Sequence, residues 1–212
     1  MTSAAAGADA DPGVIVLLFG HRRLPRALAG LAAQRVNDPA GIDAASAACR
    51  RIVVVGCDAD LAAVLTRLLR ADRLDVEVGY APRWFTARRA AFGFARRVPL
   101  IRDETGQVVV GAAYWLPDGD EPNARLHGEA VVDDTTLFDG EVTGVRIEPT
   151  LTMPGLRASA LSGRMRPRRW VPGRAAQLGT TGARVVRDGV LAARPVKRST
   201  FYRHTTGWLF VR

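Results

Sequence analysis

The sequence has 212 residues, of which 48% are hydrophobic and 24% charged, and its net charge is +9. This balance excludes an intrinsically disordered chain and allows one large or two small globular domains with proper cores. The longest early apolar run, Val14 to Phe19, is far shorter than the roughly 20 residues that span a bilayer, and no secretory cleavage pattern is present, so we expect a cytoplasmic protein.

The basic charge has two interpretations. It favours acidic partners such as nucleotides, nucleic acid or an anionic membrane surface. However, Lys197 is the only lysine, so the remaining basic residues are arginines, and a genome rich in G and C enriches arginine whatever the function. The two cysteines, Cys49 and Cys57, have no metal-ligand or redox spacing, and we expect them to be thiols.

The first hundred residues alternate between strands and helices. Residues 14–20 form a continuous aliphatic run, as expected for a strand that is buried on both faces of a parallel sheet. The leucines of residues 24–36 lie at roughly helical spacing and predict a helix. A short helix at residues 44–49 and a second buried strand at residues 51–56 follow.

Residues 61–69 have leucine and valine at the i, i+3, i+4 spacing of an amphipathic helix, and residues 74–82 alternate as a third strand. Strands that alternate with helices predict a parallel, doubly wound α/β layer. We therefore expect an α/β domain over residues 13–97, preceded by a disordered tail of small and polar residues at 1–12.

Beyond residue 97 the pattern changes to short β-rich segments separated by turn residues, which predicts an all-β, sandwich-like domain over residues 98–212. These segments are residues 107–116, 124–133, 141–149, 155–163, 182–190 and 207–212. The predicted fold class is thus an N-terminal α/β domain followed by a β-sandwich, with a ligand-binding cleft between them.

Between the second strand and the leucine-rich helix lies the stretch Gly56-Cys57-Asp58-Ala59-Asp60. This order of a buried strand, a short turn and a helix resembles the catalytic fold of the diacylglycerol and other lipid kinases, which is related to the NAD kinases. The hallmark of that family is Gly-Gly-Asp-Gly-Thr, whose glycines let backbone N–H groups approach phosphate oxygens. Gly56 and Asp58 match this motif, and the resemblance implies ATP and Mg²⁺ as cofactors.

The other three positions depart from the motif. A Cβ at Cys57 or Ala59 narrows the path of a phosphate, with roughly 1 kcal/mol of strain where φ must be positive. Asp60 is expected to begin the helix, where its carboxylate would face a bound phosphate. At about 4 Å and an effective dielectric near 20, two like charges repel by about 4 kcal/mol.

Two further segments carry the resemblance. The stretch that begins at Val78 keeps Gly79 and Pro82 of a Gly-x-x-Pro segment, and the resemblance implies nucleotide contacts for Gly79. It then places Trp84 and Phe85 where the family has small residues, so that these rings either fill the nucleotide space or stack on a base. Arg88 and Arg89 follow, and we expect them to neutralise phosphate charge.

The third segment is a late Asp-Gly-Glu, which becomes Asp188-Gly189-Val190 here. The resemblance implies that Asp188 lies nearest the acceptor and is the remaining catalytic candidate. Because Val190 replaces the glutamate, a general base for a lipid hydroxyl is missing. The matches predict the architecture, whereas the mismatches predict a pseudokinase or, where activity survives, ATP-dependent phosphorylation of a lipid hydroxyl.

The alternative function is a non-enzymatic binding module. Arginines interleave with aromatic residues in residues 164–170 and 194–204, a pattern typical of single-stranded nucleic-acid binding and equally suited to the anionic headgroups of a peripheral membrane contact. An acidic group at residues 133–141 could hold a cation or simply form a polar hairpin, and we assign no metal ligand to it.

Overall fold

The computed structural model describes residues 13–119, 121 and 124–212, so the predicted tail at residues 1–12 lies outside the described part. The chain divides into two compact units. The first comprises the described residues up to Arg97 together with Trp208–Arg212, and the second comprises Val98–Gly207. No helix in the described ranges is long and apolar enough to cross a bilayer.

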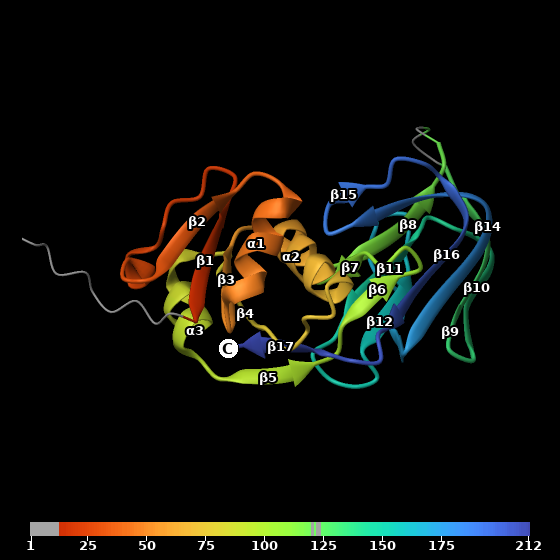
Figure 1. Ribbon diagram of the computed structural model, residues 1–212. Helices are drawn as coiled ribbons and strands as arrows, with labels where there is room; N and C mark the ends of the chain where they lie inside the picture. Colours follow the sequence, from red (N-terminus) through yellow and green to blue (C-terminus); the bar gives the residue numbers. More distant parts are fainter. Residues whose placement is uncertain (1–12, 120, 122–123) are drawn as a thin grey trace, which may run out of the picture. The chain divides into compact units, whose positions relative to one another are not determined.

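The first unit is a six-stranded sheet in the order β2-β1-β3-β4-β17-β5 (Figure 1). Its strands are β1 (Val14–Phe19), β2 (Ala32–Val36), β3 (Arg51–Val55), β4 (Glu77–Tyr80), β5 (Ala95–Val98) and β17 (Trp208–Val211). The central strands β1 and β3 are parallel and almost fully buried, as their continuous aliphatic sequences predict.

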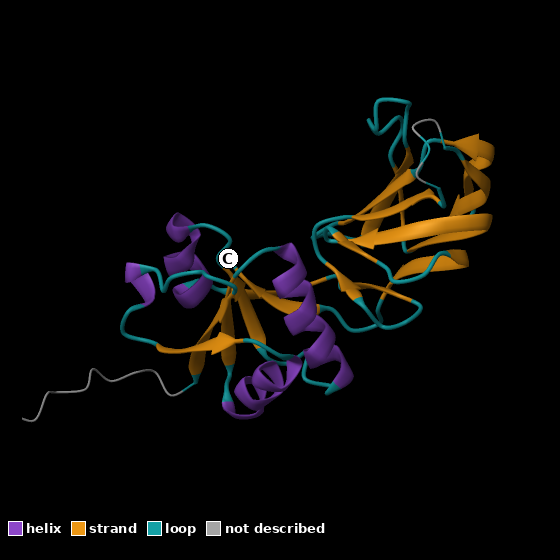
Figure 2. Cartoon of the chain, turned by 90° about the horizontal axis from the view of Figure 1, so that it is seen from above, coloured by secondary structure: helices purple, strands orange, loops and turns teal. Residues whose placement is uncertain are grey.

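Helices lie on both faces of this sheet, so the α/β layer is doubly wound (Figure 2). They are the 3₁₀ helices η1 (Arg26–Leu28) and η2 (Trp84–Thr86) and the α-helices α1 (Pro39–Ala48), α2 (Asp58–Arg70) and α3 (Ala87–Phe92). The chain leaves β1 towards β2 and leaves β3 towards β4, in opposite directions across the sheet. In such sheets, ligands bind at the carboxyl edge beside this switch in direction.

Two local predictions in this unit are wrong. Residues 24–36 form η1 and β2 rather than one helix, because Pro25 and Gly30 leave too short a run between them and Ala32–Val36 pair in parallel with β1. The helix expected at residues 44–49 has the wrong start, because α1 begins at Pro39: this proline occupies the first helical turn, and the Asp38 carboxylate accepts the Gly41 N–H at 2.9 Å.

The second unit is a network of eleven strands whose described pairs are antiparallel. The strands are β6 (Ile101–Asp103), β7 (Val108–Val109), β8 (Ala113–Pro117), β9 (Leu126–Val132), β10 (Thr135–Val142), β11 (Val145–Pro149), β12 (Leu156–Ala160), β13 (Val171–Gly173), β14 (Ala175–Arg187), β15 (Val190–Leu191) and β16 (Val196–Arg203). One apolar core lies among them, with Trp115 and Phe201 fully buried and their ring centroids 5.8 Å apart.

The final strand corrects the predicted extent of the β domain. Residues 207–212 were expected in the β-sandwich, but β17 pairs in parallel with β4, Leu209 lying opposite Glu77 and Val211 opposite Gly79. Trp208 and Val211 are buried there. A short apolar strand has the same sequence pattern in either sheet, and only its non-local pairing decides its place.

Candidate functional site

The turn after β3 is the segment that resembles a phosphate cradle. Gly56 is buried at the end of the strand, Cys57 is the N-cap of α2, and the helix begins at Asp58 rather than at Asp60. Asp58 and Asp60 both lie in the first helical turn, where the partial positive charge of the helix stabilises carboxylates by about 0.3–1 kcal/mol each. The turn therefore has two carboxylates, where the motif Gly-Gly-Asp-Gly-Thr has one.

Asp60 closes this turn from within. Its Oδ2 accepts the Cys57 backbone N–H at 2.7 Å. The carboxyl group also lies directly over Gly56, because a Cβ at this glycine would come within 2.8 Å of the Asp60 Cβ and 2.9 Å of its carboxyl carbon. An N–H that could donate to a ligand oxygen is thus already satisfied by the chain itself.

Asp58 is engaged as well. The Tyr80 hydroxyl, at the end of β4, donates to the Asp58 Oδ1 at 2.6 Å and so links the ends of β3 and β4. Partial burial, followed by this hydrogen bond, raises the pKa of Tyr80 well above its usual value. The tyrosine therefore stays a protonated donor, and Asp58 is held against the sheet edge.

A magnesium ion at this turn would share the two carboxylates with hydrogen bonds made inside the chain. Both carboxylates of the turn already accept internal hydrogen bonds, from Cys57 and from Tyr80. Across the described ranges, no group of three or more His, Cys, Asp or Glu side chains is placed to hold a metal. Mg²⁺ is usually held by one or two carboxylates together with ligand phosphates and water, so at this turn Asp58 and Asp60 would be the carboxylates available to it.

Gly79 has a packing role. It lies on β4 directly beneath α3, where an added Cβ would collide with the carbonyl oxygen of Ala90 and approach its carbonyl carbon to 2.7 Å. The helix can come this close only because Gly79 has no side chain and the inner residues of α3 are alanines, namely Ala87, Ala90 and Ala91. The assignment of Gly79 to nucleotide contacts stays a prediction.

An open hollow of about 460 Å³ lies at the carboxyl edge of the same sheet. Its cationic wall comes from Arg22 and Arg23 after β1 and from Arg83 after β4, and we call it the arginine hollow. Trp84 and Phe85 also line it, together with Leu24, Pro25, Val55, Ala81 and Pro82. The Arg22 guanidinium donates to the Pro82 carbonyl at 3.2 Å, which ties the two loops together.

The predicted cationic residues Arg88 and Arg89 are exposed on α3 and are not part of the hollow lining. Trp84 is 79% exposed and Phe85 58% exposed, so these rings do not fill an interior space. The sequence reasoning missed the lining role of Arg22, Arg23 and Arg83. Their position immediately after buried parallel strands is the signal that could have identified them.

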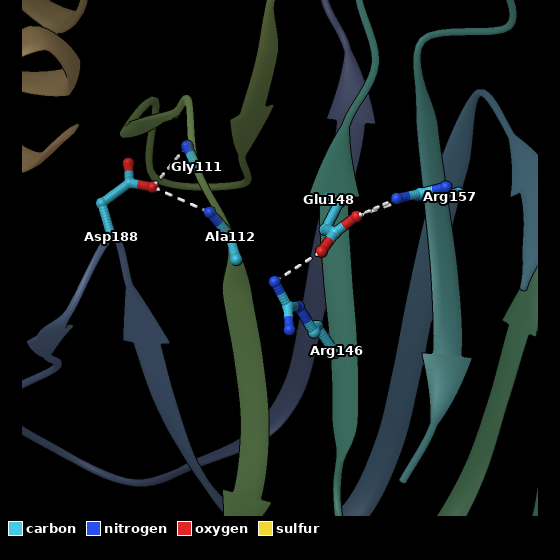
Figure 3. A network of polar contacts seen from close by, with 6 residues as sticks. All are labelled: Gly111, Ala112, Arg146, Glu148, Arg157 and Asp188. Atoms are coloured by element: carbon cyan, nitrogen blue, oxygen red, sulfur yellow. Dashed lines mark hydrogen bonds and ion pairs between the residues drawn. The ribbon is translucent and has the colours of Figure 1, made fainter. Parts of the chain in front are cut away.

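Asp188, the predicted catalytic residue, belongs to the second unit. Its carboxylate accepts the backbone N–H groups of Gly111 and Ala112 at 2.7 and 3.0 Å (Figure 3). It also accepts the N–H of Val110 at 3.0 Å. Three such bonds fix the connection between β7 and β8. The Asp188 carboxylate thus has a structural role in stabilising this connection. A catalytic role for Asp188 stays a prediction.

The same figure shows a second internally paired carboxylate, Glu148, which accepts from Arg146 and Arg157 at 2.6 Å each. The Arg157 guanidinium also lies 4.4 Å from the ring centroid of Trp170. One of the aromatic residues proposed for nucleic-acid stacking is thus covered by an arginine of the same chain.

The other two aromatic residues of that proposal are also occupied. Phe201 is fully buried in the second core, so its assignment to a nucleic-acid surface is wrong. The Tyr202 ring is covered by Arg102, whose guanidinium carbon is 4.6 Å from the ring centroid. In the acidic group at residues 133–141, Asp133 accepts the backbone N–H groups of Arg174 and Ala175, as expected for a polar hairpin.

No protein-family model and no curated protein matches the sequence. Solved structures do match. A diacylglycerol kinase from Bacillus anthracis str. Sterne has a TM-score of 0.69 at 9% identity, with 94% of this chain and 96% of that chain covered. An NAD kinase from Archaeoglobus fulgidus in complex with ATP has a TM-score of 0.60 at 12% identity, with coverages of 94% and 93%.

A yeast NADH kinase complexed with NADH is also similar, with a TM-score of 0.53 at 7% identity and coverages of 95% and 84%. All three identities are far below the range in which function transfers, so these similarities concern the fold alone. The resemblance is confirmed at the level of the fold: the chain has the fold that these diacylglycerol kinase and NAD kinase structures share.

Proposed function

We propose that this chain is a non-catalytic protein of the lipid kinase fold, which binds a phosphorylated ligand without transferring a phosphoryl group. The observation that carries the proposal is the hydrogen bond between the Asp60 carboxylate and the Cys57 N–H. A nucleotide phosphate at this turn would have to displace that carboxylate. If it remained about 4 Å away at an effective dielectric near 20, the repulsion would be about 4 kcal/mol.

The acceptor side supports the same proposal. Phosphorylation of a lipid hydroxyl needs a base that takes its proton. Val190 occupies the position at which the resemblance implies a glutamate, and the Asp188 carboxylate accepts three backbone N–H groups. Neither residue is suited to that task.

The arginine hollow is the place that we assign to ligand binding. Guanidinium groups suit phosphate oxygens because they present several donors in a fixed plane. Arg22, Arg23 and Arg83 line the hollow and no acidic residue does, so a phosphorylated ligand needs no magnesium to balance charge there. The fold neighbours include proteins solved with ATP and with NADH, which makes a nucleotide the first probe to use.

Phosphoryl transfer is tested with radiolabelled ATP, Mg²⁺ and diacylglycerol in mixed micelles. We expect no labelled phosphatidic acid above the level of a protein-free control. Labelled product at a rate that scales with the concentration of the chain, and that disappears in the Asp188→Asn variant, would overturn the proposal.

Ligand binding is tested by isothermal titration calorimetry with ATP, with and without Mg²⁺. We expect the same affinity in both, and about a tenfold or greater loss when Arg22 and Arg23 are both changed to alanine, since each charge-assisted hydrogen bond contributes about 1.5–3 kcal/mol. Changing the exposed Arg166 and Arg168 to alanine is the matched control. Binding that requires Mg²⁺ and survives the Arg22/Arg23 change would contradict the assignment.

A further inference from the structure

The outward side of α3 carries large aromatic residues. The 3₁₀ helix η2 (Trp84–Thr86) runs directly into α3 (Ala87–Phe92), so the two form one helical stretch. Trp84 is 79% exposed, Phe85 58% and Phe92 61%. A surface helix normally buries its large apolar residues and exposes its small or polar ones, and this stretch does the reverse.

The exposed residues share one side of the helix. Phe85, Arg88, Arg89 and Phe92 are spaced i, i+3, i+4 and i+7, which places them on one stripe. Trp84 joins the stripe through an edge-to-face contact with Phe85, with ring centroids 5.9 Å apart. We call this set, with Arg83, whose guanidinium lies over the Phe85 ring, the aromatic–arginine face.

Packing explains the inner side of this helix but not the outer one. Ala87, Ala90 and Ala91 are buried, and Ala90 lies so close to Gly79 that larger inner residues would not fit. Nothing in that contact requires phenylalanine or tryptophan on the outside. A gathering of exposed aromatic side chains is unfavourable in water unless a partner covers it, so it marks an interaction surface.

The charge of the face indicates which partner covers it. Between Glu77 and Val98 the sequence has five arginines and no acidic residue. Of these, Arg88 and Arg89 are exposed between the aromatic rings, and Arg83 lies 5.8 Å from the Phe85 ring centroid. Aromatic rings settle at the level of lipid headgroups, while arginines extend along them to phosphates.

We propose that the aromatic–arginine face is a docking surface for an anionic lipid membrane. The face shares Arg83, Trp84 and Phe85 with the arginine hollow, but the inference goes beyond the proposed function because Arg88, Arg89 and Phe92 lie outside the lining of that hollow. A membrane fits better than single-stranded nucleic acid. The aromatic residues project from an outward helical stripe, as in interfacial helices, whereas nucleic acid is typically held in a groove with stacking platforms.

The first test is co-flotation of the full chain with vesicles. We expect binding to phosphatidylcholine vesicles that contain about 30 mol% phosphatidylserine, and little binding to vesicles of phosphatidylcholine alone. Changing Arg88 and Arg89 to glutamate is expected to weaken binding about 30-fold or more, since each near-surface arginine contributes about a fivefold step in affinity. The matched control, Arg166→Glu with Arg168→Glu, removes the same charge from an exposed loop and is expected to bind like the unmodified chain.

The second test reports insertion of the aromatic residues. Trp84 is strongly exposed, whereas Trp115 and Trp208 are buried and Trp170 is half-buried under Arg157. Anionic vesicles are therefore expected to shift the tryptophan emission to the blue by an amount that Trp84→Phe abolishes. Phe85→Ser with Phe92→Ser changes only exposed side chains, and its fold is checked by circular dichroism. It is expected to lose flotation about tenfold or more.

Three outcomes would overturn the proposal. Equal losses in the Arg88/Arg89 and Arg166/Arg168 variants would show that net charge, or the arginines of residues 164–170, decides binding and that the aromatic–arginine face does not. Binding of an oligothymidine with no vesicle binding would assign the face to nucleic acid. A dimer in sedimentation equilibrium that Phe85→Ser with Phe92→Ser dissociates, again with no vesicle binding, would assign it to a second copy of the chain.

Discussion

Two connections at the carboxyl edge of the first sheet differ in charge and in exposure. The turn after β3 is acidic, and its N–H at Cys57 is satisfied by Asp60. The segment after β4 is basic, and it leaves Trp84 and Phe85 exposed beside an open hollow. The backbone N–H in the first connection is satisfied within the chain, whereas the aromatic side chains of the second are open to solvent. A shared fold therefore says where a ligand could bind, while the side chains at each loop decide whether one does.

The largest effect is expected from a change that disrupts the packing of α3 against β4. Changing Gly79 to valine places a side chain against the Ala90 backbone, which cannot move without lifting the helix. We expect a loss of about 3 kcal/mol or more in unfolding free energy, measured by urea denaturation. Gly179→Ala, at a strand position with open space around the new Cβ, is the control and is expected to change little. Equal stability of both variants would refute the packing role of Gly79.

A smaller loss is expected when the Asp188 carboxylate, which accepts backbone N–H groups, is removed. Asp188→Ala leaves the N–H groups of Val110, Gly111 and Ala112 without their acceptor and is expected to cost about 2–3 kcal/mol of stability. The exposed Asp134→Ala is the control. If Asp188→Ala were as stable as the unmodified chain, the structural interpretation of this aspartate would fail and a purely functional one would regain support.

A smaller effect is expected at the turn after β3. Asp60→Ala removes the acceptor of the Cys57 N–H and should lower the unfolding free energy by about 1 kcal/mol, the usual contribution of a helix cap. Asp75→Ala, which removes an exposed side chain in a surface ion pair with Arg73, should cost less than about 0.5 kcal/mol. A higher stability in Asp60→Ala than in the unmodified chain would mean that the carboxylate strains the turn instead of closing it.

The smallest effect at neutral pH concerns Tyr80. Because burial and the bond to Asp58 raise its pKa in the folded state, its contribution to stability is complete below the unfolded value of about 10 and declines as the pH rises above it. We expect the decline to be less steep in Tyr80→Phe, measured by urea denaturation between pH 9 and pH 11 (about one unit on either side of that value). Identical pH dependence in both proteins would contradict the Tyr80–Asp58 contact.

Local patterns predicted much of the first unit. Strands β1 and β3 and helix α2 follow from continuous aliphatic runs and a leucine stripe, which depend on the chain's own neighbours. The place of β17 could not be predicted, because Leu209 pairs with Glu77 across more than half of the sequence. Helix α3 was missed because its buried side is made of alanines and its large residues face outward, the inverse of the usual signal.

The candidate site was predicted less well than the fold. The acidic character of the Gly56–Asp60 turn is visible in the sequence, but the return of the Asp60 side chain to the Cys57 N–H needs the helix start to be known within one residue. Arg88 and Arg89 were assigned by their nearness to the motif, whereas the arginine that lines the hollow is Arg83, which precedes the helical stretch. Side-chain direction, which the helical register sets, separates these cases.

The measurement that tests the central claim most directly compares two titrations with MgATP. One uses the unmodified chain, and the other uses a variant with Cys57→Gly, Ala59→Gly and Asp60→Thr, in which the turn regains Gly-Gly-Asp-Gly-Thr. We expect the variant to bind MgATP at least about tenfold more tightly, because removing the Asp60 charge relieves a repulsion of more than 1.4 kcal/mol. Equal affinity in the two proteins, with Mg²⁺ dependence in both, would contradict the claim that this turn is closed.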